Sequence, residues 1–153
     1  MYLDKVIARL NKHGYVLTPC KRYEVANVEE ELSIKLPVAY KEFLLEMGKN
    51  ANSFMVGSSC YYDEILYLKG WADELLEENK FKALPNNCFV FWMHQGYQFA
   101  FFFLDAGDDP PVYYYSEVGN NANNPDFILT DKSFSSYLDN VLSDEIKIRE
   151  MEW

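Results

Sequence analysis

Lysine and arginine are missing from one long stretch of this sequence. None occurs from Ala83 to Asp131, although the 153 residues include 14 of them and the formal net charge is -10. Acidic residues do occur in this stretch, so its surface is expected to repel nucleic acid and to attract a basic protein partner. The ordinary alternative is that the negative charge only keeps the protein soluble.

Cysteine and histidine are scarce as well. The three cysteines, Cys20, Cys60 and Cys88, lack C-x-x-C spacing, which argues against a zinc site or a disulfide framework and predicts free thiols. Only His13 and His94 could act as imidazole bases. Cys88 and His94 are separated by the length of a strand, roughly 20 Å, so they cannot form a nucleophile and its base.

The sequence also lacks the motifs of known catalytic sites. It has no glycine-rich phosphate loop, no G-x-S-x-G elbow and no paired Cys and His ligands. Asp105, Asp108 and Asp109 depart from the calcium-loop pattern, and a turn explains them better. We therefore expect no metal, no cofactor and no enzymatic activity, with an unrecognised small-molecule enzyme as the alternative.

No apolar run reaches the roughly 18 residues of a membrane span. Residues Met1–Leu10 carry Asp4, Lys5 and Arg9 where a signal peptide needs an apolar centre. These absences predict a cytoplasmic protein with no membrane partner. The length fits a single domain over residues 1–153.

The most structured part of the sequence is an aromatic stretch in its second half. Phe89–Met93 and Phe99–Leu104 are aromatic and β-branched almost throughout, and His94–Tyr97 can form the turn of a hairpin between them. Val112–Tyr115 follows as a third strand after a break that contains Gly and Pro. Because the first two strands do not alternate between apolar and polar residues, both faces of the hairpin are expected to be covered.

Helices are available as this cover, indicated by apolar residues at helical spacing and by Gly or Pro near helix ends. They are expected over Tyr2–His13, from an N-cap at Asn27 through Leu32, from Pro37 to Gly48, over Leu68–Asn79 and from Phe134 to Ile146. Short strands are expected at Phe54–Val56 and Phe127–Leu129, while Tyr15–Thr18 and Cys60–Lys69 stay open. The fold class is therefore α+β, with a mainly antiparallel β-sheet flanked by helices.

The candidate partner-binding residues are acids and tyrosines in or beside the third strand and its loops. Tyrosine is enriched at interface hot spots, and alternation along a strand must turn part of Tyr113–Tyr115 away from the core. The residues proposed are Asp105, Asp108, Asp109, Tyr113, Tyr115 and Glu117. The alternative for any single tyrosine is that it packs beneath a helix.

The order of these features resembles the SUKH superfamily, which comprises the Smi-Knr cell-wall regulators of fungi and many bacterial relatives. The likeness covers about residues 24–145 and depends on apolar and turn positions. These are Leu36-Pro37, Tyr40, Phe43-Leu44, Gly48, Leu84-Pro85, Phe89–Phe91, Asp105, Pro111-Val112, Ser133-Phe134 and Tyr137-Leu138. Met47–Asn50 departs from the turn that is usual in that family.

The resemblance implies an α+β domain and a function in protein binding. Bacterial members are typically immunity proteins, or antitoxins, that neutralise a cognate polymorphic toxin, often a nuclease. A basic nuclease would suit the acidic, tyrosine-bearing stretch. The alternative that the resemblance implies is a non-enzymatic interaction module in cell-wall or stress regulation.

Overall fold

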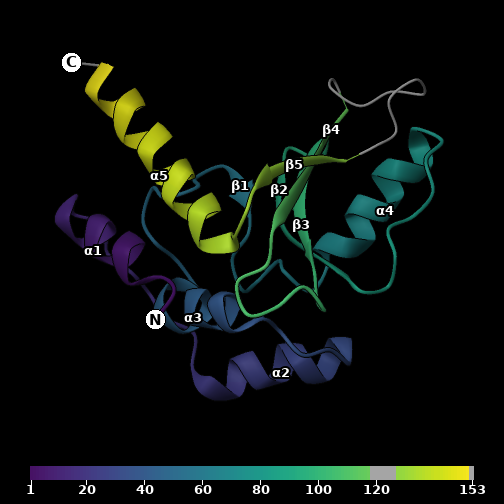
Figure 1. Cartoon of the computed structure of the whole chain (residues 1–153), viewed down its shortest axis with the longest axis horizontal. Helices are drawn as coiled ribbons and strands as arrows, with labels where there is room; N and C mark the ends of the chain where they lie inside the picture. Colours follow the sequence, from purple (N-terminus) through teal and green to yellow (C-terminus); the bar gives the residue numbers. More distant parts are fainter. Residues whose placement is uncertain (118–126, 152–153) are drawn as a thin grey trace.

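The computed structural model describes residues 1–117 and 127–151 and contains one five-stranded antiparallel sheet whose strand order follows the chain. The strands are β1 (Ser58–Ser59), β2 (Cys88–His94), β3 (Gln98–Phe103), β4 (Val112–Ser116) and β5 (Ile128–Asp131). The fold is α+β, as the sequence predicts. Figure 1 shows helices on both sides of this sheet.

The predicted hairpin is confirmed as β2 and β3. Its turn residues Gln95 and Gly96 both have positive φ, 51° and 77°, and the Tyr97 N–H donates to the His94 carbonyl oxygen at 3.3 Å, which closes a tight turn between the strands. Phe89 pairs with Phe102 and Val90 with Phe101, and the register then shifts between Val90 and Trp92. This β-bulge adds one residue to β2 and increases the local twist.

One face of the hairpin packs against α3 (Val38–Met47) and α5 (Phe134–Met151). Tyr40 of α3 is fully buried, with ring centroids 5.0 Å from Phe89 and 5.5 Å from Phe102. Phe134 of α5 closes the same cluster, 5.4 Å from Tyr40 and 5.1 Å from Phe91. Behind this layer, α1 (Asp4–Lys12) packs on α5 and α2 (Arg22–Leu32) packs on α3.

The other face is covered by α4 (Leu68–Glu78). Leu75 and Leu76 of α4 are buried, as are Met93, Phe99 and Phe101 of the sheet. Figure 1 shows α4 and α5 on opposite sides of the sheet. The expectation that both faces of the hairpin are covered is therefore confirmed.

The second helix begins earlier than predicted, at Arg22 rather than after Asn27. The Glu24 carboxylate accepts a hydrogen bond from the Lys21 N–H at 2.9 Å and pairs with the Lys49 ammonium at 2.8 Å. A glutamate that reaches back to the residue before a helix stabilises its N-terminus. This contact puts the helix start five residues before Asn27, which lies in the second turn.

The strand expected at Phe54–Val56 is wrong, because these residues form turns and Met55 has a φ of 56°. The Met55 N–H donates to a Glu145 carboxylate oxygen of α5 at 2.7 Å, so a tertiary contact fixes this backbone. The edge strand is the shorter β1 that follows. Thr18 forms an isolated bridge with Asn50, and Phe127 precedes β5 instead of opening it.

No helix within the described ranges is both long and apolar enough to cross a membrane.

Candidate functional site

The β3–β4 loop carries three of the predicted acidic residues and contacts the start of α3 through its backbone. The Ala39 N–H, in the first turn of α3, donates to the Asp108 carbonyl oxygen at 2.8 Å. The Asp108 side chain is exposed and accepts from the Tyr2 hydroxyl at 3.4 Å. The exposed Asp105 accepts from the Asn87 amide at 3.2 Å. The loop therefore has a structural function at the start of α3, with two carboxylates at its surface.

Asp109 is committed to the N-terminus of α5. Its two carboxylate oxygens accept from the Ser135 N–H at 2.9 Å and the Ser135 hydroxyl at 2.5 Å. Free N–H groups in the first turn of a helix need such acceptors, and a carboxylate there also suits the helix dipole. Asp109 thus caps α5 from a distant part of the chain, and its carboxylate is already engaged.

The expectation that Tyr115 lies on a partner-facing surface is wrong. Tyr115 is 1% exposed, stacks on Phe99 at 5.1 Å and accepts a hydrogen bond from the Asn79 amide at the end of α4. Burial raises the pKa of its hydroxyl. Tyr113 shares this sheet face and is half-buried, stacked on Phe101 at 5.6 Å. Alternation along β4 puts both side chains on the face that α4 covers.

Glu117 lies apart from the other predicted residues. It follows β4 directly, and its N–H donates to the Tyr97 carbonyl oxygen beside the β2–β3 turn. Asp105, Asp108 and Asp109 precede β4, so an entire strand separates them from Glu117. The six predicted residues therefore do not form one surface, because the two ends of a strand lie at opposite ends of the sheet.

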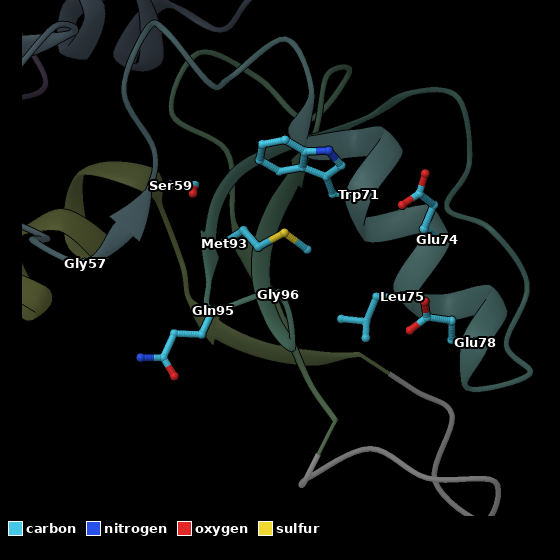
Figure 2. Close-up of a pocket in the computed structure, with 9 residues that line it drawn as sticks. All are labelled: Gly57, Ser59, Trp71, Glu74, Leu75, Glu78, Met93, Gln95 and Gly96. Atoms are coloured by element: carbon cyan, nitrogen blue, oxygen red, sulfur yellow. The ribbon is translucent and has the colours of Figure 1, made fainter.

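The structure places a different site between α4 and the β1–β2 edge of the sheet. Here a groove of about 460 Å³ is open to solvent, within the range of about 300–1,000 Å³ typical of ligand pockets. Figure 2 shows its walls, with α4 on one side and β1 and the β2–β3 turn on the other. The residues that line it are Gly57, Ser59, Trp71, Glu74, Leu75, Glu78, Met93, Gln95 and Gly96.

The apolar part of this groove is aromatic and partly exposed. Trp71 and Leu75 point from α4 towards Met93 of β2 (Figure 2). Trp71 is 39% exposed, and Tyr67, 58% exposed, stacks beside it with ring centroids 5.9 Å apart. Partly exposed, rigid aromatic side chains of this kind are frequent among interface hot spots.

The polar part of the groove is acidic. Glu74 and Glu78 line it from α4, and both side chains are exposed. Lys69, one turn before Asp73, is held by that residue in an ion pair at 2.9 Å. Neither Glu74 nor Glu78 forms an ion pair with any residue in the part of the chain that the structure describes. Both carboxylates are available to a cation.

Residues 19–140 match the sequence model of the SMI1/KNR4 family (SUKH-1). The chain belongs to this family. No curated protein matches the chain. Membership of SUKH-1 confirms the resemblance seen in the sequence. It is consistent with an immunity function or a Smi1/Knr4-type function. The matched region includes both walls of the groove.

The sequence of this SUKH-1 protein predicts α4 but not the groove beside it. One signal was present, since Trp71, Glu74 and Glu78 are spaced at i, i+3 and i+7 and so share one helix face. Asp73 of the same helix accepts from the Leu84 N–H at 2.9 Å, so its carboxylate is already engaged.

The candidate nucleophiles of this SUKH-1 protein lie outside the groove. All three cysteines are free and buried, and burial raises the pKa of Cys20 and of Cys88 to about 11. The Nδ1 atom of His94 lies 3.3 Å from the Ser58 hydroxyl oxygen. No group of three or more His, Cys, Asp or Glu side chains is placed to hold a metal ion within residues 1–117 and 127–151.

Proposed function

We propose that this SUKH-1 protein is a non-enzymatic immunity protein that binds and neutralises a basic toxin. The observation that carries the proposal is the groove between α4 and the β1–β2 edge. It combines an exposed tryptophan with two exposed glutamates that form no ion pair with the described residues. Aromatic side chains supply affinity at an interface, and complementary charge supplies orientation and speed of association.

The charge of the whole chain supports a basic partner. A net charge of -10 attracts a cationic protein over distances longer than a contact. A toxin that acts on nucleic acid must itself present a basic surface to phosphates. An acidic groove would compete with nucleic acid for that basic surface, so we propose a nuclease as the toxin class. The proposed place of binding is the cytoplasm of the protected cell.

The test is capture followed by neutralisation. The purified protein, immobilised, is used to isolate partners from the cells that encode it, and each partner is then expressed with and without this protein. We expect a basic partner that stops growth when expressed alone, and whose purified activity is inhibited at an equimolar ratio. Partners that are harmless when expressed alone, or toxins whose activity is unaffected by binding, would refute the proposal.

The family description supports a second candidate function. SMI1/KNR4 is the name under which the match is described, and the fungal members of the superfamily regulate the cell wall. An interaction module in cell-wall or stress regulation could use the same groove without a toxin. In that case deletion of the gene would alter sensitivity to cell-wall stress, and no captured partner would be toxic.

A further inference from the structure

We infer that the groove between α4 and the β1–β2 edge is a recognition site for an arginine side chain carried by an extended segment of a basic protein. The inference rests on the proposed function, because it names what the toxin would insert. It assigns a position to the guanidinium group, between the Trp71 ring and the carboxylates of Glu74 and Glu78.

The spacing of the three side chains suits one planar cation. Glu74 and Glu78 are four residues apart on α4, which places their Cβ atoms about 5–6 Å from each other. A guanidinium has five N–H donors in a flat fork and can bond two such carboxylates at once. Trp71 lies three residues before Glu74 on α4, a spacing at which side chains are neighbours, so a cation held by Glu74 is within reach of the indole.

Arginine fits this arrangement better than lysine. Its flat, weakly hydrated guanidinium can stack on an indole while its edge bonds carboxylates, whereas an ammonium is a compact and strongly hydrated charge. Tyr67 stacks on Trp71, with its ring at 22° to the indole plane. An indole that a neighbouring ring already holds in place loses little conformational entropy when a ligand binds to it.

The rest of the groove suits the residues on either side of the arginine. Leu75 and Met93 form an apolar floor between the two walls. Gly57 and Gly96 contribute no side chains to the opposite wall, and with φ values of 83° and 77° they are positions that other residues rarely occupy. An extended chain can therefore approach the sheet edge while its apolar residues contact the floor.

Peptide titration tests the inference without any toxin. The probe is a blocked pentapeptide, Ser-Leu-Arg-Leu-Ser, compared with versions that carry lysine or the uncharged isostere citrulline. Binding is followed by ¹⁵N-edited NMR, in which the Trp71 indole N–H is assigned by its loss in Trp71→Phe. The variants are Glu74→Gln and Glu78→Gln, with Glu77→Gln as the matched control, since Glu77 is an exposed acid on α4 that does not line the groove.

We expect the arginine peptide to shift the Trp71 indole signal and the backbone signals of Leu75, Met93 and Gly96. Each groove variant should weaken its binding by about three- to tenfold, and the lysine peptide should bind weaker by a similar factor. Glu77→Gln should change the dissociation constant by less than about twofold. Equal binding of the citrulline peptide, a Trp71 signal that does not move, or equal loss in Glu77→Gln would overturn the inference.

The peptide titration and the toxin assay test the arginine site and the proposed function independently. If a basic toxin is neutralised but Glu74→Gln and Glu78→Gln neutralise it equally well, the arginine site is refuted and the proposed function stands. If the arginine peptide binds as expected but every captured partner is harmless, the proposed function is refuted and the site stands. Spermidine that displaces the arginine peptide at equal concentration would show a general polyamine site and would refute arginine recognition.

Discussion

At the scale of single residues, the core of this protein is unusually aromatic, and most of its rings lie in the hairpin or contact it. Phe101 is 1% exposed and has four aromatic neighbours, with ring centroids 5.0 Å from Phe127, 5.6 Å from Tyr113, 5.8 Å from Phe103 and 6.1 Å from Phe99. A ring enclosed in this way cannot be removed without leaving a cavity, because its neighbours hold each other in place.

Phe101→Ala is therefore expected to lower the free energy of unfolding by about 3–5 kcal/mol. That is a large share of the stability of an ordinary domain. Urea denaturation followed by circular dichroism measures the change. Tyr23→Ala is the control, since Tyr23 is 69% exposed and should cost little. An unchanged midpoint for Phe101→Ala would mean that this strand is not in the core.

Glu145 gives a second prediction at this scale. Burial raises the pKa of its carboxyl above the ordinary value, although the Met55 N–H and the Tyr15 hydroxyl both donate to it. A raised pKa in the folded state means that folding favours the protonated form. The associated stability is complete below the unfolded-state pKa of about 4.3 and is lost as the pH rises through the folded-state value.

Glu145→Gln removes this titration. Its single amide oxygen can still accept from the Met55 N–H, while its NH₂ group replaces the oxygen that accepts from the Tyr15 hydroxyl, a loss that does not depend on pH. Relative to this variant, the wild-type protein should be most stable in acid, and its advantage should decline as the pH rises above about 4.3. Urea denaturation of both proteins across this range gives the difference. A difference that is independent of pH, or that grows in favour of the wild type with rising pH, would contradict the prediction.

At the scale of elements, the two helices that cover one sheet face contact each other through the same aromatic cluster. Phe43 of α3 lies 6.0 Å from Phe134 of α5, and Leu138 of α5 is 1% exposed. Each helix therefore packs against both the sheet and the other helix. Neither helix can move away without exposing the aromatic residues of β2 and β3.

Phe43→Asp and Leu138→Asp are each expected to unfold the protein, because each would bury a carboxylate without a partner. Near-UV circular dichroism reports the loss of packed aromatic rings. Leu45→Asp is the control on α3, since Leu45 is 36% exposed and its replacement should leave a folded protein. Native-like spectra for Phe43→Asp or Leu138→Asp would show that the apolar stripe of that helix is a surface.

At the scale of the whole molecule, negative charge and the groove are expected to act on different steps of binding. Long-range attraction acts on the association rate and is screened beyond about 8 Å at physiological ionic strength. Contacts inside the groove act on the dissociation rate. Asp105 and Asp108 can be neutralised at little structural cost because both are exposed, whereas Asp109 caps α5 and must be kept.

Association with the captured toxin should therefore slow as salt is added, and should slow further in the Asp105→Asn, Asp108→Asn double variant. Trp71→Ala should leave association nearly unchanged and speed dissociation by about tenfold or more, as expected for a hot spot. Surface plasmon resonance at two salt concentrations measures both rates. Association rates that respond neither to salt nor to the double variant would show that the charge serves solubility alone.

The sequence by itself determined the local structure and the family. Apolar periodicity placed α4 and α5, proline and glycine bounded α3, and the aromatic runs on either side of Gln95-Gly96 predicted the hairpin. These patterns are informative because helix and strand periods act between residues close in the chain. The start of α2 was missed because an unsuspected N-terminal contact by Glu24 decided it.

Only the tertiary structure decided where the candidate site lies. Alternation shows that Tyr113 and Tyr115 share a face of the sheet, but not that α4 covers this face. Nothing in the sequence around Asp109 indicates that its carboxylate caps a helix that begins 25 residues later. Trp71 and Met93 meet in one groove because α4 packs across β2. Such contacts depend on the register and packing of elements distant in the chain, which no local pattern records.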